Sequence, residues 1–225
     1  MKCYGNFMKE TIKQSLSPLN ILNIFQEEHR LCSPLDPEAD PEVELSFNST
    51  IDEWRSARDL IPWKPLSAFL NKEFNISPTA EEWKAVLVPP SKRTLKDVCE
   101  LISKCATYQD IKPIKLLGQE CLSSAVFLTL KKYLENRQVD VSNLRPSTLV
   151  VPYLENHFSE MIEQVNIIAN GKRVFDKLEL KQKKAGFLNY ISLFDKDRYT
   201  FLTGNINTFR DLVFKIIEVN NQPPN

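Results

Sequence analysis

Glycine is scarce in this chain: five glycines stand against fourteen prolines in 225 residues. Phosphate-binding loops, nucleophile elbows and dinucleotide fingerprints need glycine where the backbone turns sharply or approaches a ligand closely. None of these motifs occurs in the sequence. We therefore predict no bound cofactor.

Histidine is scarcer still, with only His29 and His157, and it is the usual general acid or base at neutral pH. Cys121 and His157 form a thiol–imidazole candidate pair, provided that both lie at the rim of one pocket. The alternative places Cys121 in the core and His157 on a helix flank. No CxxC occurs, and His29 with Cys32 lacks further ligands, so we predict neither a metal site nor a catalytic residue.

The chain also lacks a surplus of charge, since 29 basic residues balance 29 acidic ones. Nucleic acid is therefore not the expected partner, whereas self-association meets little electrostatic resistance. The longest apolar run, 122–130, is too short to cross a bilayer, and no apolar leader opens the chain. The five scattered cysteines are typical of reduced thiols, which favours a cytoplasmic protein without membrane insertion.

What the sequence does contain is a series of helical patterns separated by proline. Apolar residues recur at helical spacing, and Ser or Thr followed by Pro or an acidic residue marks several starts. This predicts a mainly α fold, an irregular multi-helix bundle. We expect helices over 7–29 (restarting at Ser17), 52–60, 63–74, from Ser77 to 88, from Thr94 to 105, 117–136, 149–169 (ending at Asn170) and after Asn207 or Thr208.

One segment near the C-terminus allows two interpretations. Residues 199–203 are β-prone and could form a small hairpin with 188–194 across an Asp-Lys-Asp turn. Alternatively, 185–194 is a helix. The periodicity does not decide between them.

Residues 33–50 contain three prolines and five acidic residues but no basic one. Such a composition cannot build a core and is typical of a linker. It predicts an N-terminal helical arm over 1–32, an acidic linker over 33–50, a helical core domain over 51–170, and a helical or α+β element over 171–225 that packs on the core.

Arg145, Ser147 and Thr148 are the candidates for anion binding. An arginine beside two hydroxyls at a helix start could hold a carboxylate or phosphate through free amides and the positive end of the dipole. The alternative is a plain proline turn with a Ser or Thr cap.

Trp54, Trp63 and Trp83 lie close together in sequence and are candidates for a partner surface, because tryptophan is enriched at interface hot spots. Core packing is the alternative. The stretch 172–184 carries six basic residues and could contact nucleic acid. Its only aromatic residue is Phe175, so a solvated face is the alternative.

Together these features favour a non-catalytic helical binding or interaction protein, whose partner is another protein or a second copy of the chain. One alternative is an enzyme of unfamiliar type that acts on a small anionic substrate. Another is nucleic-acid binding through 172–184.

Overall fold

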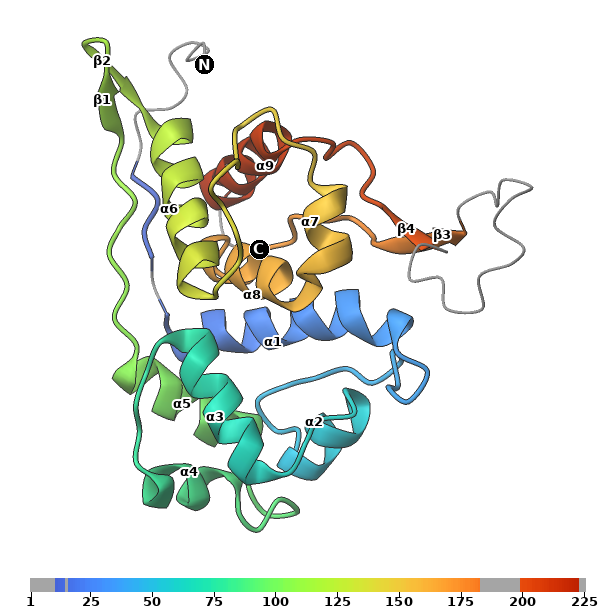
Figure 1. Ribbon diagram of the computed structural model, residues 1–225. Helices are drawn as coiled ribbons and strands as arrows, with labels where there is room; N and C mark the ends of the chain where they lie inside the picture. Colours follow the sequence, from blue (N-terminus) through green and yellow to red (C-terminus); the bar gives the residue numbers. More distant parts are fainter. Residues whose placement is uncertain (1–10, 15, 183–198, 223–225) are drawn as a thin grey trace.

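The computed structural model of the chain describes residues 11–14, 16–182 and 199–222. Within these ranges it contains nine α-helices and two antiparallel two-stranded sheets, which confirms the mainly α prediction (Figure 1). The helices are α1 (Pro18–Cys32), α2 (Ile51–Ala57), α3 (Trp63–Phe74), α4 (Ala80–Leu87), α5 (Leu95–Cys105), α6 (Leu122–Asn136), α7 (Val151–Asn156), α8 (Phe158–Ile168) and α9 (Phe209–Asn221). The strands are β1 (Ile114–Leu116), β2 (Gln119–Cys121), β3 (Glu179–Gln182) and β4 (Tyr199–Leu202), and a short 3-10 turn, η1, spans Ser33–Leu35.

Several helices begin where the sequence predicts. The Ser17 hydroxyl accepts a hydrogen bond of 3.2 Å from the amide of Asn20, with proline at the first position of α1. At α9, the Thr208 amide donates to the Asp211 carboxylate at 2.8 Å, and the Asp211 amide donates back to the Thr208 hydroxyl at 3.3 Å. The Ser17 cap and the Thr208–Asp211 capping box satisfy amides that the first helical turn leaves without a partner.

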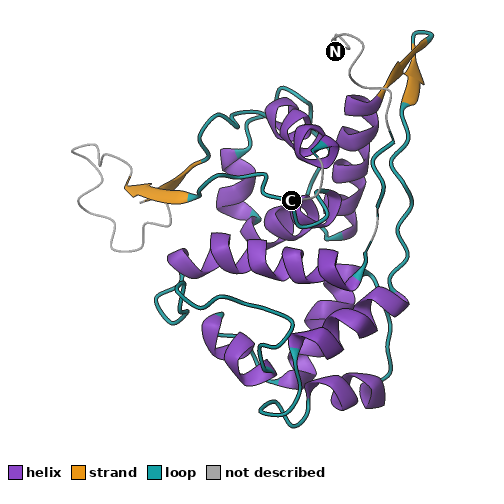
Figure 2. Ribbon diagram, turned by 180° about the vertical axis from the view of Figure 1, so that it is seen from behind, coloured by secondary structure: helices purple, strands orange, loops and turns teal. Residues whose placement is uncertain are grey.

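Helix α1 lies between two hydrophobic clusters (Figures 1 and 2). Its residues Ile21, Ile24 and Phe25 join the cluster of α2–α5, which we call the N-terminal lobe. Leu31, near its end, joins the cluster of α6–α9, the C-terminal lobe. Helix α1 is therefore built into both cores, while the predicted domain boundaries stay a prediction.

Two tryptophans fill the N-terminal lobe. Trp54 and Trp83 are each 1% exposed, and the Trp54 ring lies 4.8 Å from that of Phe25. The Trp83 indole nitrogen donates to Asn71 at 2.9 Å. Apolar packing has therefore removed Trp54 and Trp83 from solvent, as the core-packing alternative expects. Trp63 is half-buried at the start of α3.

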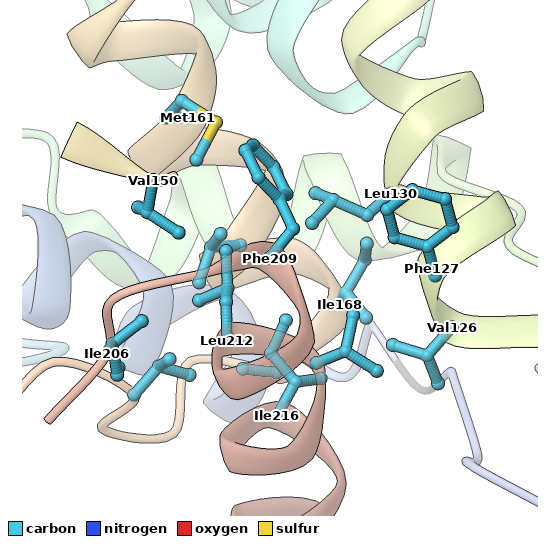
Figure 3. Packing of buried hydrophobic residues seen from close by; sticks show 14 of the residues in the cluster. Val126, Phe127, Leu130, Val150, Met161, Ile168, Ile206, Phe209, Leu212 and Ile216 are labelled. Carbon is cyan, nitrogen blue, oxygen red and sulfur yellow. The ribbon is translucent and has the colours of Figure 1, made fainter. Parts of the chain in front are cut away.

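The C-terminal lobe is built around α9. Figure 3 shows Phe209, Leu212 and Ile216 of this helix directed toward side chains of α6 and α8, among them Leu130 and Ile168. All five residues are fully buried. The amphipathic pattern that predicts the last helix therefore identifies its packing face correctly.

The two lobes meet closely at the end of α8. The predicted stop is confirmed, since Asn170 and Gly171 both have positive φ, of 54° and 72°. A Cβ atom on Gly171 would lie 2.5 Å from the backbone nitrogen of Ile24 in α1. Glycine is required here both by the backbone conformation and by the contact with α1.

The acidic segment 33–50 lies against α2 and the start of α5. The amide of Lys96 donates to the carbonyl of Phe47 at 3.1 Å, and the amide of Asp40 donates to the carbonyl of Ala57 at 3.0 Å. Leu45 is buried. The role of this segment as a tether between domains stays a prediction.

The predicted helix over 7–29 is wrong at residues 11–14 and 16, while residue 15 lies outside the described residues. Ile12 is extended and exchanges two backbone hydrogen bonds with Ile111, of 3.0 and 2.9 Å. Pairing with a distant segment replaces the local helical pattern at this point. The part of the prediction over 7–10 lies outside the described residues.

Two other predicted helices are too long. Residues 117–121 form the turn and second strand of the β1–β2 hairpin, because Leu117 and Gly118 both take positive φ, as a two-residue hairpin turn requires. The predicted helix 149–169 is interrupted at His157, which separates α7 from α8.

Residues 199–202 of the β-prone segment form a strand, as predicted, and this strand pairs with β3. Glu179 stands opposite Leu202 and Gln182 opposite Tyr199. Both interpretations of 185–194 lie outside the described residues. No helix in the described ranges combines the length and apolar character needed to cross a bilayer.

Candidate functional site

The predicted anion site at Arg145, Ser147 and Thr148 is a turn attached to α9. The Arg145 amide donates to the Thr148 hydroxyl at 2.9 Å, and the Thr148 amide donates to the Arg145 carbonyl at 2.9 Å. The amide of Arg210 in turn donates to the carbonyl of Pro146 at 2.8 Å. The Arg145 and Ser147 side chains are exposed, and anion binding there stays a prediction.

Cys121 and His157 lie on different elements. The Cys121 sulfur is buried at the start of α6, 3.1 Å from the Ser124 hydroxyl. The His157 ring lies 6.3 Å from that of Tyr153, at the junction of α7 and α8. Neither side chain lines the large cleft described below.

The basic stretch is partly committed to internal contacts. The Lys172 ammonium donates to the carbonyls of Val219 and Gln222 at 3.0 and 2.9 Å, at the negative end of α9. Lys177 pairs with Glu179 at 2.6 Å. These contacts leave fewer cations of this stretch available to a nucleic acid.

A large cleft lies where the lobes meet. It has a volume of about 1010 Å³. Its walls are the end of α3, the extended segment 107–114, one face of α6, and Gln164 of α8. We call it the interlobe cleft. Two other clefts, of 440 and 620 Å³, lie beside the 33–50 segment.

Three buried polar side chains line the interlobe cleft: Glu73, Arg137 and Gln164, which are 2%, 8% and 4% exposed. Both carboxylate oxygens of Glu73, Nε and Nη1 of Arg137, and Nε2 of Gln164 lack hydrogen-bond partners among the described residues. Buried polar atoms without partners are unusual and each costs roughly 1–3 kcal/mol. These atoms lie just beneath the surface at the floor of the cleft, so a ligand can hydrogen-bond to them once a side chain rotates.

Glu73 and Arg137 of this floor also belong to a buried cluster of charges, whose members come from five parts of the chain. Arg58 at the end of α2 donates to Glu28 of α1 at 2.7 Å. Arg137 at the end of α6 pairs with Glu163 of α8. Glu73 of α3 has no arginine of its own. We call these five residues the interlobe charge cluster.

The cluster holds three carboxyls against two guanidiniums, so one proton balances its charge. Burial, then the negative charges of Glu28 and Glu163 and a hydrogen bond to Glu28, raises the pKa of Glu73 well above its usual value. Burial, followed by the charge of Glu28, raises the pKa of Glu163 to about 8, although Arg137 opposes the shift. When Glu73 is protonated, its carboxyl group donates a hydrogen bond to Glu28. Two ionised carboxylates could not form this hydrogen bond, because neither has a proton to donate.

The rim of the cleft is positively charged. Lys72, Lys112 and Lys132 extend from three different walls and are all exposed. The one acidic rim residue recorded for this cleft, Asp110, pairs with Lys13 at 2.9 Å and accepts from the Gln14 amide at 3.1 Å. The rim therefore presents a cationic field to a ligand.

The remaining wall is amphipathic. The rings of Tyr108 and Tyr133 meet edge to face at 5.9 Å, and Ile114 and Leu128 extend the apolar surface. Burial raises the pKa of Tyr108 and of Tyr133, so both hydroxyls stay protonated at neutral pH.

Within residues 11–14, 16–182 and 199–222, no group of three His, Cys, Asp or Glu residues is arranged to hold a metal ion.

Sequence analysis did not identify the interlobe charge cluster, although a signal was present. Glu28 follows Ile24 by four residues and Phe25 by three, and Glu73 follows Leu70 by three. Each carboxylate thus occupies the apolar face of its helix, where an ionised residue is costly. A charged residue at such a position indicates a buried polar site, but not which partners reach it.

We compared the chain with models of known protein families, with curated proteins and with solved structures, and none of the three comparisons finds a match.

Proposed function

We propose that the chain is a non-catalytic binding protein that takes a small ligand into the interlobe cleft. The observation that carries this proposal is the convergence on one cleft of three buried polar side chains, each of which retains an atom without a hydrogen-bond partner among the described residues. A cleft of about 1010 Å³ matches the volume of known small-molecule sites, which pair apolar walls with a few placed polar groups. A ligand that formed the missing hydrogen bonds would offset the free-energy cost of burying those groups without partners.

The position of the cleft supports a ligand that links the two lobes. Glu73 comes from the N-terminal lobe, whereas Arg137 and Gln164 come from the C-terminal lobe. A ligand bound to all three would stabilise their relative placement, because binding to the folded state alone raises the free energy of unfolding.

The cytoplasm remains our proposed location. Burial raises the pKa of the Cys32 thiol to about 11 and that of the Cys99 thiol to about 12, so both stay protonated and unreactive. Association with another protein or with a second copy is a further part of the proposal. Nucleic-acid binding through 172–184 has less support, given the internal contacts of Lys172.

The test is a fragment screen by ligand-observed NMR on two variants of α6. Thr129 lines the cleft, whereas Lys131, on the same helix, does not. We expect Thr129→Trp to fill the cleft and abolish the binding of fragments that bind the wild type. Lys131→Trp should retain it. Fragments that bind both variants equally, or a complete lack of fragment binding to the wild type, would contradict the proposal.

An enzyme acting on a small anionic substrate is the second candidate, and one observation favours it. Glu73 combines a raised pKa with a place in a cleft beside Arg137, as a general acid requires. Turnover of carboxylate or phosphate esters that Glu73→Gln abolishes while the variant still binds substrate would support this candidate. Undiminished turnover in Glu73→Gln would exclude Glu73 as the proton donor.

A further inference from the structure

Arg137 supplies unpaired donors on the floor of the interlobe cleft. It retains Nε–H and Nη1–H groups without partners among the described residues, because its Nη2 contacts Glu163. Gln164 retains its Nε2–H group. Arg137 can only donate hydrogen bonds, whereas the Gln164 amide and the Glu73 carboxyl can also accept them. A ligand group that binds Arg137 must therefore accept hydrogen bonds.

The charge around the floor has the same preference. Three lysines surround the opening, and the Asp110 carboxylate is already paired with Lys13. Arg137 pairs with Glu163 through Nη2, but its Nε–H and Nη1–H groups have no partner among the described residues. The rigid guanidinium plane fixes the directions in which these two groups donate. Charge-assisted hydrogen bonds from arginine to a carboxylate or phosphate are shorter and stronger than neutral ones.

The apolar wall indicates that the ligand is more than an inorganic ion. Ile114 and Leu128, with the Tyr108–Tyr133 pair, leave room beside the donors for a hydrocarbon or aromatic group. Leu128 is 51% exposed, and contact with a ligand would remove part of this apolar surface from water. An amphipathic wall next to a donor floor suits a molecule with an acidic head and an apolar body.

We propose that the ligand of the interlobe cleft is a small organic anion, whose carboxylate or phosphate head is bound by Arg137 and Gln164 and whose apolar body lies against Tyr108, Ile114 and Leu128. This inference rests on the proposed function, since it names the ligand class of the same cleft. The lysine rim attracts the anion, and the floor orients its head group.

The experiment compares four probes that share one ring: benzoate, phenyl phosphate, benzyl alcohol and benzylamine. The Kd of each is measured by titration, with the side-chain amide resonance of Gln164 in ¹⁵N spectra as the local report. We expect either benzoate or phenyl phosphate to bind roughly tenfold or more tightly than benzyl alcohol and to shift the Gln164 resonance. The stronger of the two anions identifies the head group.

Matched charge reversals localise the effect. Lys132→Glu is on the cleft rim, and Lys131→Glu is its neighbour on α6 outside the cleft. Lys132→Glu should weaken binding of the anion roughly fivefold to tenfold, and Lys131→Glu less than about twofold. Because Lys132 is exposed, this substitution leaves the packing of the buried core unchanged.

The outcomes separate the two proposals. If benzyl alcohol binds as tightly as the anions, and Thr129→Trp abolishes that binding, the binding function stands and the anionic ligand is wrong. If the anions bind but the two charge reversals weaken them equally, the anions bind outside the cleft and the inference is overturned. If no probe of any charge binds, both proposals fail.

Discussion

Replacing Glu73 with glutamine tests the interlobe charge cluster by removing its excess carboxyl. Glu73→Gln keeps the size of the side chain and leaves two carboxylates, Glu28 and Glu163, opposite two guanidiniums. No proton is then needed to balance the charge. The wild type, in contrast, loses stability as rising pH deprotonates Glu73 in the unfolded chain while the folded chain still holds the proton.

The sign and size of the effect follow from the raised pKa. Below the usual value of 4.5, Glu73 is protonated in both the folded and the unfolded chain, so pH has no effect through this group. Above it, only the folded chain keeps the proton, and the free energy of unfolding falls by up to about 1.4 kcal/mol per pH unit. The loss continues until the pH reaches the raised pKa of Glu73 in the folded chain.

The assay is urea denaturation followed by the fluorescence of the buried Trp54 and Trp83, repeated from acid to mildly alkaline pH. His29 contributes the opposite slope. Burial lowers the pKa of His29 below 6.5. Its imidazole contacts the Val43 carbonyl at 2.9 Å and the Ser33 hydroxyl at 2.6 Å. Because the folded chain favours the neutral ring, the free energy of unfolding decreases as pH falls. The difference between wild type and Glu73→Gln cancels the His29 contribution.

We expect Glu73→Gln to match the wild type near pH 5 and to exceed it by roughly 2 kcal/mol near pH 8. Glu100→Gln is the control, because the Glu100 side chain is 56% exposed on α5. It should keep the wild-type pH profile. A Glu73→Gln protein with an unchanged slope, or with lower stability than wild type at pH 8, would refute the reasoning.

Three further predictions, made with five substitutions, test the packing and a helix cap. Gly171→Ala should cost roughly 3 kcal/mol or more in the free energy of unfolding, because its Cβ would lie 2.5 Å from the α1 backbone, whereas Gly118→Ala, with φ of 81° and open space, should cost about 1–2 kcal/mol; equal costs would contradict the close approach. Trp54→Ala should cost about 3–5 kcal/mol and the half-buried Trp63→Ala clearly less, as urea midpoints would show. Thr208→Ala should lower the free energy of unfolding by about 1 kcal/mol, because it removes the cap of α9, and an unchanged free energy would mean that the capping box does not stabilise the protein.

The sequence predicts helix starts well because the signals are local. Ser17, Thr94 and Thr208 each contact amides or side chains within one turn, so their spacing suffices to place α1, α5 and α9. Predictions fail where a distant segment competes. The Ile12–Ile111 pairing joins residues far apart in sequence, and helical periodicity carries no information about it.

The candidate site was beyond sequence analysis for the same reason. The five residues of the interlobe charge cluster come from five parts of the chain, and their proximity depends on how α1 packs between the lobes. The predicted candidates, such as Arg145 with Thr148, are close in sequence and make a local turn. Proximity in sequence selects turns and caps, whereas this cleft is assembled by tertiary packing.

The most direct test of the account is a crystal structure of the protein soaked with whichever of benzoate and phenyl phosphate binds more tightly. The account predicts the carboxylate or phosphate head group within hydrogen-bond distance of Arg137 and Gln164, with the ring against Tyr108 and Leu128. A probe bound only at the turn of Arg145, or an empty interlobe cleft at saturating probe, would contradict it.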